Sequence, residues 1–404
     1  MSLISRSNYL EWLVRQKDRQ IIKVVSGVRR CGKSTLFALY QDYLLANGVS
    51  PAQIISINFE SIEYEDLLDY KTLYCTISEK LLPDKKSYIF LDEIQHVADY
   101  QKAVDSLFLK ENCDLYLTGS SACFRSGELA TLLTGRCIEL SMMPLSFKEF
   151  CGGLNEEQKS ASLQEKFFLY LAAGSFPYVL RHQLGLTEAR EYLRSVYESI
   201  LLNDVVKRYN IADVSMLESI AKFLMHNIGN RTSPTTIANT MTSNSRKIDP
   251  KTVERYLCGL TESLMMYKAR RYNIKGKEFL ATMHKYYAAD IGMRNVLVKG
   301  QASDIGHILE NIVYLELRRR GYEVCAGQLG ASGEVDFVAL KDGRTEYYQV
   351  SETTLDESVL RRELAPLQKI RDNYPKHLLT LDTVFGEADY DGIQKTNVLN
   401  WLLA

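Results

Sequence analysis

The residues best suited to chemistry lie in one glycine-containing segment near the start of the chain. Residues 27 to 34 read Gly-Val-Arg-Arg-Cys-Gly-Lys-Ser, which matches the pattern G-x-x-x-x-G-K-[ST] at every fixed position. Glycines in such a segment let successive backbone N–H groups curve around phosphate oxygens, and the positive end of a following helix adds to their attraction. The segment therefore predicts a binding site for nucleotide phosphates.

Individual roles follow from this pattern. Lys33 would reach the β- and γ-phosphates of ATP, and the Ser34 hydroxyl would ligate Mg²⁺. Cys31 would favour the thiolate, and its alkylation would block nucleotide binding, if its sulfur is exposed. Arg29 and Arg30 could touch phosphate or a neighbour, or could face solvent. The full set expected around the nucleotide is Gly27, Val28, Arg29, Arg30, Cys31, Gly32, Lys33, Ser34 and Thr35.

A second acidic motif ends a hydrophobic run. Residues 88 to 93 read Tyr-Ile-Phe-Leu-Asp-Glu, the Walker B pattern. At the carboxyl end of a parallel strand both carboxylates would point into the crevice where such sheets bind ligands. Asp92 is expected to hold Mg²⁺, and Glu93 to orient and polarise the attacking water.

Two further kinds of catalytic group are expected after the acidic motif. A hydroxyl in the segment 117–121 could sense the γ-phosphate, and Ser120 is the first candidate, with Thr118 second. Arg136, or alternatively Arg125, could stabilise charge in the transition state. The arginine could act within its own subunit or on a neighbouring one, or it could be purely structural.

The elements that must position these residues can be predicted from the hydrophobic pattern. A β-branched run at 21–26 ends at Gly27, and residues 34–46 have helical spacing. Short apolar runs separated by helix-length segments follow, at 54–59, 88–91, 115–117 and 137–140. This alternation is typical of an α/β fold with a parallel sheet covered by helices on both faces.

The remainder of the chain changes character twice. From 155 to 230 the pattern is helical, and the segment that follows contains two helix starts, at Pro234 and Pro250, that resemble a helix-turn-helix. After Gly300 a helix and several strands indicate a further α/β unit. The expected domains are an ATP-binding domain at 1–155, a helical connector or lid at 156–230, a winged helix at 231–300 and an α/β domain at 301–404.

The order and spacing of these motifs resemble a family of bacterial and archaeal ATPases in which an AAA domain precedes a C-terminal domain of unknown function. The resemblance implies an AAA-type P-loop fold and ATPase chemistry. The strings that carry it are residues 27–35, Leu91-Asp92-Glu93-Ile94-Gln95, Thr118-Gly119-Ser120-Ser121, Gly135-Arg136, Pro144-Leu145-Ser146-Phe147-Lys148-Glu149-Phe150 and Gly174-Ser175-Phe176-Pro177.

A basic segment lies within the expected winged helix. Residues 246–285 contain ten lysines or arginines against four acids. On a winged helix Lys251 and Arg255 would lie on the second helix, and further basic residues (Arg270, Arg271, Lys275 and Lys277) around the wing, where such modules contact DNA phosphates. The alternative is a winged helix that serves as an ATPase lid or docking surface, with its basic residues solvated.

The last domain resembles a PD-(D/E)xK nuclease core. The matching residues are Glu310 on the first helix, Gly333-Glu334-Val335-Asp336 at a strand start and Gln349-Val350-Ser351 on the next strand. Hydrolysis at such a site needs carboxylates to hold Mg²⁺ and a lysine to assist water, but Gln349 is uncharged and Ser351 replaces the lysine. An inactive, interaction-type domain is therefore expected, although Glu310 and Asp336 could still hold a metal weakly.

Composition limits the expected cellular location of the protein and the kinds of partner that it can bind. The formal net charge is −1, so only a local patch could hold nucleic acid, and the eight cysteines are scattered as in a reduced cytosolic protein. Arg6, Glu11 and Arg15 interrupt any secretion signal, and no apolar stretch is long enough to span a membrane. A cytoplasmic protein without membrane contact is expected, with a possible homo-oligomer or partner protein left open.

The sequence thus predicts a Mg²⁺-dependent ATPase that acts as a nucleotide-driven switch, with DNA as a candidate partner. Two alternatives stay open. One is a DNA-binding regulator that holds ATP as a signal and hydrolyses it slowly. The other is an ATP-dependent nuclease.

Overall fold

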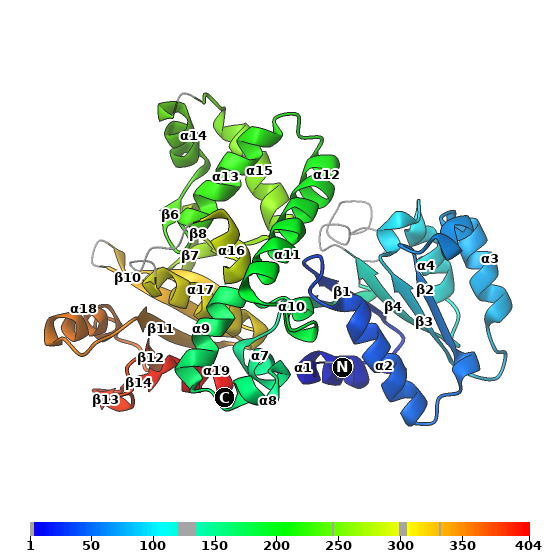
Figure 1. The fold of residues 1–404 in the computed structure, drawn as a ribbon, viewed down its shortest axis with the longest axis horizontal. Helices are drawn as coiled ribbons and strands as arrows, with labels where there is room; N and C mark the ends of the chain where they lie inside the picture. The colour runs from blue at the N-terminus through cyan, green and yellow to red at the C-terminus, as the bar shows by residue number, and fades with distance from the viewer. Residues whose placement is uncertain (1–3, 120–134, 245, 299–304, 331–332) are drawn as a thin grey trace. The chain divides into compact units, whose positions relative to one another are not determined.

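The chain folds into two compact units, Met1–Pro144 and Leu145–Ala404. The computed structural model in Figure 1 describes residues 4–119, 135–244, 246–298, 305–330 and 333–404. The first unit ends slightly before the expected boundary at residue 155. The finer division of the remainder at residues 230 and 300 stays a prediction.

A parallel five-stranded sheet forms the centre of the first unit, with the order β2-β3-β4-β1-β5. Its strands are β1 (Ile22–Gly27), β2 (Ile54–Asn58), β3 (Ser87–Asp92), β4 (Cys113–Gly119) and β5 (Cys137–Met142). The helices are α1 (Ser7–Arg15), α2 (Lys33–Ala46), α3 (Tyr70–Lys80) and α4 (Tyr100–Phe108), with 3₁₀ turns at Pro51–Gln53, Ile62–Leu67 and Ile94–His96. The predicted α/β fold with a parallel sheet is confirmed.

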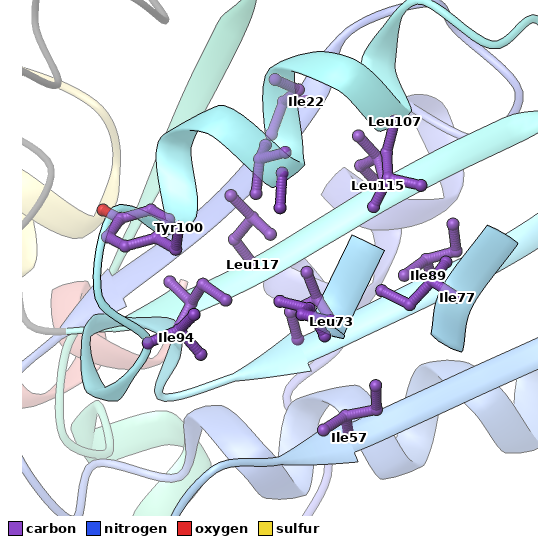
Figure 2. Packing of buried hydrophobic residues seen from close by; sticks show 14 of the residues in the cluster. Ile22, Ile57, Leu73, Ile77, Ile89, Ile94, Tyr100, Leu107, Leu115 and Leu117 are labelled. Carbon is purple, nitrogen blue, oxygen red and sulfur yellow. The ribbon is translucent and has the colours of Figure 1, made fainter. Parts of the chain in front are cut away.

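Helices cover both faces of this sheet because its central strands are apolar on both sides. On one face, Leu73 and Ile77 of α3 and Leu107 of α4 pack on isoleucines and leucines of the strands, as Figure 2 shows. On the other face, Phe37 of α2 lies edge-on to Phe90 of β3, with ring centroids 5.2 Å apart. This packing holds the carboxyl ends of the strands at one edge, where the sequence motifs lie.

The second unit begins with helices, as the pattern from 155 to 230 predicts. They are α7 (Phe147–Gly153), α8 (Glu156–Lys159), α9 (Leu163–Ala173), α10 (Pro177–Arg181), α11 (Leu186–Ser199), α12 (Lys207–Tyr209) and α13 (Val214–His226), with a π-helical stretch at Ile200–Val206. Side-chain caps explain several helix starts. The Ser162 hydroxyl, for example, accepts a hydrogen bond from the Glu165 amide at 3.2 Å.

A helix pair and a hairpin follow α13. The elements are β6 (Arg231–Thr232), α14 (Pro234–Ser243), α15 (Pro250–Glu262), β7 (Met266–Asn273) and β8 (Glu278–Ala288). Both helices begin with proline at the positions expected, behind the caps Ser233 and Asp249. Strands β6 and β7 pair with β8 in antiparallel fashion.

The remaining elements extend the same sheet across residue 300. They are α16 (Ile291–Leu297), α17 (Ile305–Arg319), β9 (Glu323–Gln328), β10 (Glu334–Lys341), β11 (Arg344–Ser351), α18 (Glu357–Gln368), β12 (Lys376–Thr380), β13 (Ala388–Tyr390), β14 (Ile393–Asn397) and α19 (Val398–Leu403). The strand order is β13-β14-β12-β11-β10-β9-β7-β8-β6. Because β7 pairs with β9, the hairpin and the last α/β segment share one sheet.

No helix in the described parts of the chain combines the length and the hydropathy needed to cross a membrane.

Candidate functional site

The phosphate loop connects β1 to α2 and is tightly packed at its start. Gly27, the last residue of β1, lies opposite Met142 of β5. A Cβ atom at Gly27 would collide with the carbonyl oxygen of Met142 and would lie 2.7 Å from Cys31 Sγ. Gly32, which precedes α2, has φ 106°, in the left-handed region that favours glycine. Both glycines of the motif are therefore required by the backbone itself.

Lys33 is the first residue of α2. Its side chain points into the unit, and only 5% of its surface is exposed. Its Nζ lies 3.3 Å from the carbonyl oxygen of Gly27 and 3.3 Å from Glu93 Oε1. Burial by itself lowers the pKa of Lys33, but the neighbouring Glu93, Cys31 and Asp92 together outweigh burial and raise it. The side chain therefore stays cationic.

Asp92 ends β3 on the same edge of the sheet. Burial raises the pKa of its carboxyl group, and hydrogen bonds from Thr118 and Ser34 partly offset that effect. The Thr118 hydroxyl, on neighbouring β4, donates to Asp92 Oδ1 and accepts a hydrogen bond from the Glu93 amide at 2.8 Å. Ser34 and Asp92, the two oxygen donors expected for Mg²⁺, thus lie together.

Glu93 occupies an unusual backbone position, with φ 55° and ψ 48°. A non-glycine residue in this region is strained, and such strain concentrates at functional sites. Burial by itself raises the pKa of Glu93, but Lys33, Gln95 and Arg29 together outweigh burial, so the pKa lies below its usual range. The Gln95 amide holds the other carboxylate oxygen, with Nε2 donating to Oε2 at 2.6 Å.

The other expected nucleotide contacts differ in exposure. Val28 is buried, Thr35 is half-buried, and Arg30 and Ser34 are exposed. Arg29 forms an ion pair with Glu60, with 3.3 Å between Nη1 and Oε1.

Cys31 does not have the environment that would make it reactive. Its side chain is fully buried, and burial raises the pKa of its thiol, although Lys33 and Arg6 act in the opposite direction. The condition attached to its predicted reactivity, an exposed sulfur, is therefore not met.

Arg136 lies at the amino-terminal ends of the parallel strands, whereas the phosphate loop lies at their carboxyl ends. Its carbonyl oxygen accepts a hydrogen bond from the amide of Ile22, at the start of β1, and its guanidinium pairs with Asp105 of α4. The six residues of β1, a span of about 20 Å, separate the amino-terminal ends of the strands from the loop. Action on its own chain's site is therefore not supported, and action on a neighbouring copy stays a prediction. Ser120 and Arg125 lie outside the described residues.

Sequence reasoning missed the roles of three residues near this site. Gln95 holds Glu93, and Thr118, the second candidate for a γ-phosphate sensor, also joins Asp92 to the Glu93 backbone. Arg6, from the segment before α1, donates to the carbonyl oxygen of Cys31. Gln95 closely follows Glu93 in the acidic motif, so its proximity was a signal. Arg6 offered none, because it lies 25 residues from Cys31.

A second polar cluster lies in the C-terminal unit, where the nuclease-like residues were expected to meet. Glu310 of α17 and Asp336 of β10 do come together, but a lysine from β8 lies between them. Lys285 Nζ is 2.8 Å from Glu310, 2.9 Å from Glu334 and 3.9 Å from Asp336. Only 4% of the surface of Lys285 is exposed. Lys285 was counted in the basic segment, and its burial here corrects its placement on that surface.

Gln349 and Ser351 have local hydrogen-bond partners. Gln349 Nε2 donates to Glu363 at 2.8 Å, and the Ser351 hydroxyl donates to the carbonyl oxygen of Thr353 at 3.0 Å. Burial and the neighbouring Glu310 raise the pKa of Asp336 well above its usual range. Among the residues that the structure describes, no three His, Cys, Asp or Glu side chains are grouped to hold a metal ion.

The other basic residues of the segment 246–285 fall into two groups. Arg246, Arg270 and Arg271 have protein partners: Asp213, Glu323 and Gln328, respectively. The remaining six are exposed and lie on or before α15, at the start of β7 and between β7 and β8: Lys247, Lys251, Arg255, Lys268, Lys275 and Lys277. The surface available for phosphate is thus smaller than the sequence count implied.

Two family models match parts of the chain. Residues 19–151 match the family model of an AAA domain, and residues 164–304 match that of a domain of unknown function, DUF8612. A Haemophilus influenzae protein described as uncharacterized is 39% identical over 403 residues, covering 100% of this chain and 99% of the relative. An uncharacterized protein of Methanocaldococcus jannaschii is 28% identical over 377 residues, covering 89% and 82%.

A solved structure shares the fold. The Walker-type ATPase of Pyrococcus abyssi aligns with a TM-score of 0.50 at 14% identity, covering 73% of this chain and 96% of that one. The AAA-type P-loop fold of the first unit is therefore shown by both sequence and structure.

Proposed function

Because the chain belongs to the family of AAA-domain proteins that includes its Haemophilus influenzae relative, we propose that it binds and hydrolyses ATP with Mg²⁺. The observation that carries this proposal is the meeting of Lys33, Asp92 and Glu93 at the carboxyl edge of the parallel sheet. Lys33 comes from the start of α2, whereas Asp92 and Glu93 lie at the end of β3, so two separate segments bring these charges together.

Each side chain has a defined task in this proposal. The loop amides and the Lys33 ammonium bind the phosphates, and the Ser34 hydroxyl and the Asp92 carboxylate hold Mg²⁺. When bound, the metal ion neutralises charge that develops on the phosphates. Glu93, kept ionised beside Lys33, accepts a hydrogen bond from the attacking water and orients it.

Paired substitutions test this division of labour. Glu93→Gln should leave the affinity for Mg²⁺·ATP within about twofold and slow hydrolysis by roughly 10²–10⁴-fold, because only the water-polarising carboxylate is lost. Lys33→Ala should weaken binding at least about tenfold. Fluorescent-nucleotide titration and phosphate release measure the two effects, and Glu65→Gln on the same unit is the surface control. Hydrolysis by Glu93→Gln at the parent rate would show that Glu93 is not the group that activates water.

The second candidate function is contact with DNA through the second unit. The element order α13, β6, α14, α15, β7 and β8 supports a winged helix, and exposed lysines lie between β7 and β8. DNA would then either stimulate ATP hydrolysis, as expected of a nucleotide-driven switch, or bind to a protein that hydrolyses ATP slowly. Turnover measured with and without DNA at fixed salt separates these two roles.

For the third alternative, an ATP-dependent nuclease, the charge cluster offers little support. A lysine can take a proton from water only as the neutral amine, and the three carboxylates around Lys285 raise its pKa although burial lowers it. We therefore assign the last segment an interaction role. Strand cleavage that is lost in Asp336→Ala would reverse this assignment.

A further inference from the structure

The segment that precedes α1 reaches the phosphate loop although it lies outside the AAA match, which begins at residue 19. Arg6 occupies the N-cap position of α1, and its side chain is buried, with 4% of the residue surface exposed. Its guanidinium lies over the ring of Tyr9, with 4.7 Å between the guanidinium carbon and the ring centroid. A buried arginine needs hydrogen-bond acceptors to offset the loss of water, so its partners indicate what the residue holds.

The guanidinium of Arg6 joins two separate backbone segments. Nη1 donates to the carbonyl oxygen of Cys31 at 3.3 Å, and Nη2 donates to that of Met143 at 2.6 Å. Met143 directly follows β5, and its amide donates to the Tyr9 hydroxyl at 3.2 Å. Arg6 and Tyr9 thus fasten the phosphate loop to the end of β5, and the planar fork of the arginine places one donor against each of the two carbonyl groups.

The bond to Cys31 determines the direction of one loop amide. In a trans peptide unit the carbonyl oxygen and the following N–H point in opposite directions. Holding the Cys31 carbonyl therefore directs the Gly32 N–H away from Arg6. Glycine places little steric restriction on its own φ, so this peptide unit could otherwise rotate, and Gly32 already has φ 106°.

We propose that Arg6 is a positioning residue of the phosphate site, which fixes the Cys31–Gly32 peptide unit so that the Gly32 amide is presented to a nucleotide phosphate. The inference rests on the proposed ATP binding. It assigns a positioning role to a residue outside the matched domain, so the start of α1 contributes to the nucleotide site.

Equilibrium titration of the full chain with a fluorescent ADP and Mg²⁺ tests the proposal. Arg6→Met should raise the Kd about tenfold and Arg6→Lys about threefold, because an ammonium group is a compact point charge that does not reproduce the forked geometry of the guanidinium. The KM for ATP should rise in parallel while kcat stays within about twofold, since phosphate binding is altered equally in the ground and transition states. Arg15→Met, at the exposed end of the same helix, should match the parent chain.

The outcomes separate this inference from the proposed function. A merely structural arginine would lower the Tm of Arg6→Met and leave the Kd unchanged, and that result overturns the inference. If Arg6→Met does not fold, Arg6→Lys keeps the charge and decides the question by the same criterion. A parent chain that binds nucleotide no better than Lys33→Ala overturns both proposals, whereas parental binding with unchanged Arg6 variants overturns only the role of Arg6.

Discussion

Cys31 illustrates how burial decides the chemistry of a single residue. A cysteine beside Lys33 could be an activated thiolate, but its side chain is fully buried and burial raises the pKa of the thiol. Reactivity needs access as well as a positive neighbour. The position is better explained by packing, since Cys31 Sγ fills the space beside Gly27.

Alkylation in the folded protein should therefore spare Cys31. We expect iodoacetamide to modify the exposed Cys75 and Cys258 at least about tenfold faster, and all three at similar rates in urea. Peptide mass spectrometry over a time course measures these rates. Labelling of Cys31 as fast as that of Cys75 without denaturant would contradict the buried position.

Asp382 predicts a pH dependence of stability. Its carboxylate is bound by Lys395 Nζ at 2.9 Å and by the Thr353 hydroxyl at 2.6 Å. Burial by itself raises the pKa of Asp382, but these hydrogen bonds and those from Thr354 lower it from 3.8 to about 2. Because the folded-state pKa is depressed, the stabilisation is present above about pH 4 and is lost as the pH falls toward 2.

Urea unfolding of Asp382→Asn, compared with that of the parent chain, tests whether this stabilisation is lost as the pH falls. The variant should be less stable at pH 6, and the difference should shrink steadily between pH 4 and pH 2. Thr396→Ser, on the same strand as Lys395, is a control without a charge change. A difference that stays constant over this range would mean that the titration of Asp382 does not contribute.

At the scale of elements, side chains of β8 connect the β7–β8 hairpin to α17 and β10 of the last α/β segment. Lys285 contacts carboxylates of α17 and β10, and the Tyr287 hydroxyl donates to Glu310 at 2.6 Å. Asn311 of α17 also bonds both backbone groups of Ala288, at 2.7 and 2.9 Å. A lysine on a strand in a basic segment thus neutralises acids that a nuclease would use for metal.

Removing this lysine should destabilise the second unit. Lys285→Met would leave Glu310 buried without its cation, a loss of about 3–5 kcal/mol. The double variant Lys285→Met with Glu310→Gln should recover part of that loss, because the uncompensated charge is also removed. Urea unfolding of the single and double variants measures both effects, and Lys275→Met is the exposed control. An unchanged unfolding midpoint for Lys285→Met would contradict the buried ion pair.

At the scale of the whole molecule, a net charge of −1 means that any affinity for DNA must come from a local surface. The exposed basic residues on α15 and between β7 and β8 form such a candidate surface, which we call the α15–wing surface: Lys251, Arg255, Lys275 and Lys277. The buried Lys285 and the paired Arg270 do not contribute to it.

Replacing all four residues of the α15–wing surface by glutamine should weaken DNA binding at least about tenfold at low salt. The slope of log K against log salt should fall by up to about 0.9 for each phosphate that the variant no longer neutralises. Fluorescence anisotropy with a short duplex at several salt concentrations measures both quantities. A control variant with Lys71, Lys80, Lys85 and Arg361 changed to glutamine should bind like the parent, and equal binding by both variants would exclude the α15–wing surface.

Much of the first unit was predictable because its signals are local. Hydrophobic runs predicted the five strands within one or two residues at each end, and the pattern from Gly27 to Ser34 predicted the loop between strand and helix. A strand that ends in Asp92 and Glu93 predicted the second half of the site. In a parallel sheet the carboxyl ends share one edge, so consecutive motifs along the chain become neighbours in space.

The tertiary structure decided what no local pattern could. Arg6 reaches Cys31 and Met143 across 25 and 137 residues, and the charge of Lys285 is neutralised by acids that follow it by 25 or more. An arginine or lysine looks the same in sequence whether it faces solvent or a buried carbonyl. Only the packing of distant elements determines which water is removed from a charge, and therefore which charges hold the site together and which are left for a partner.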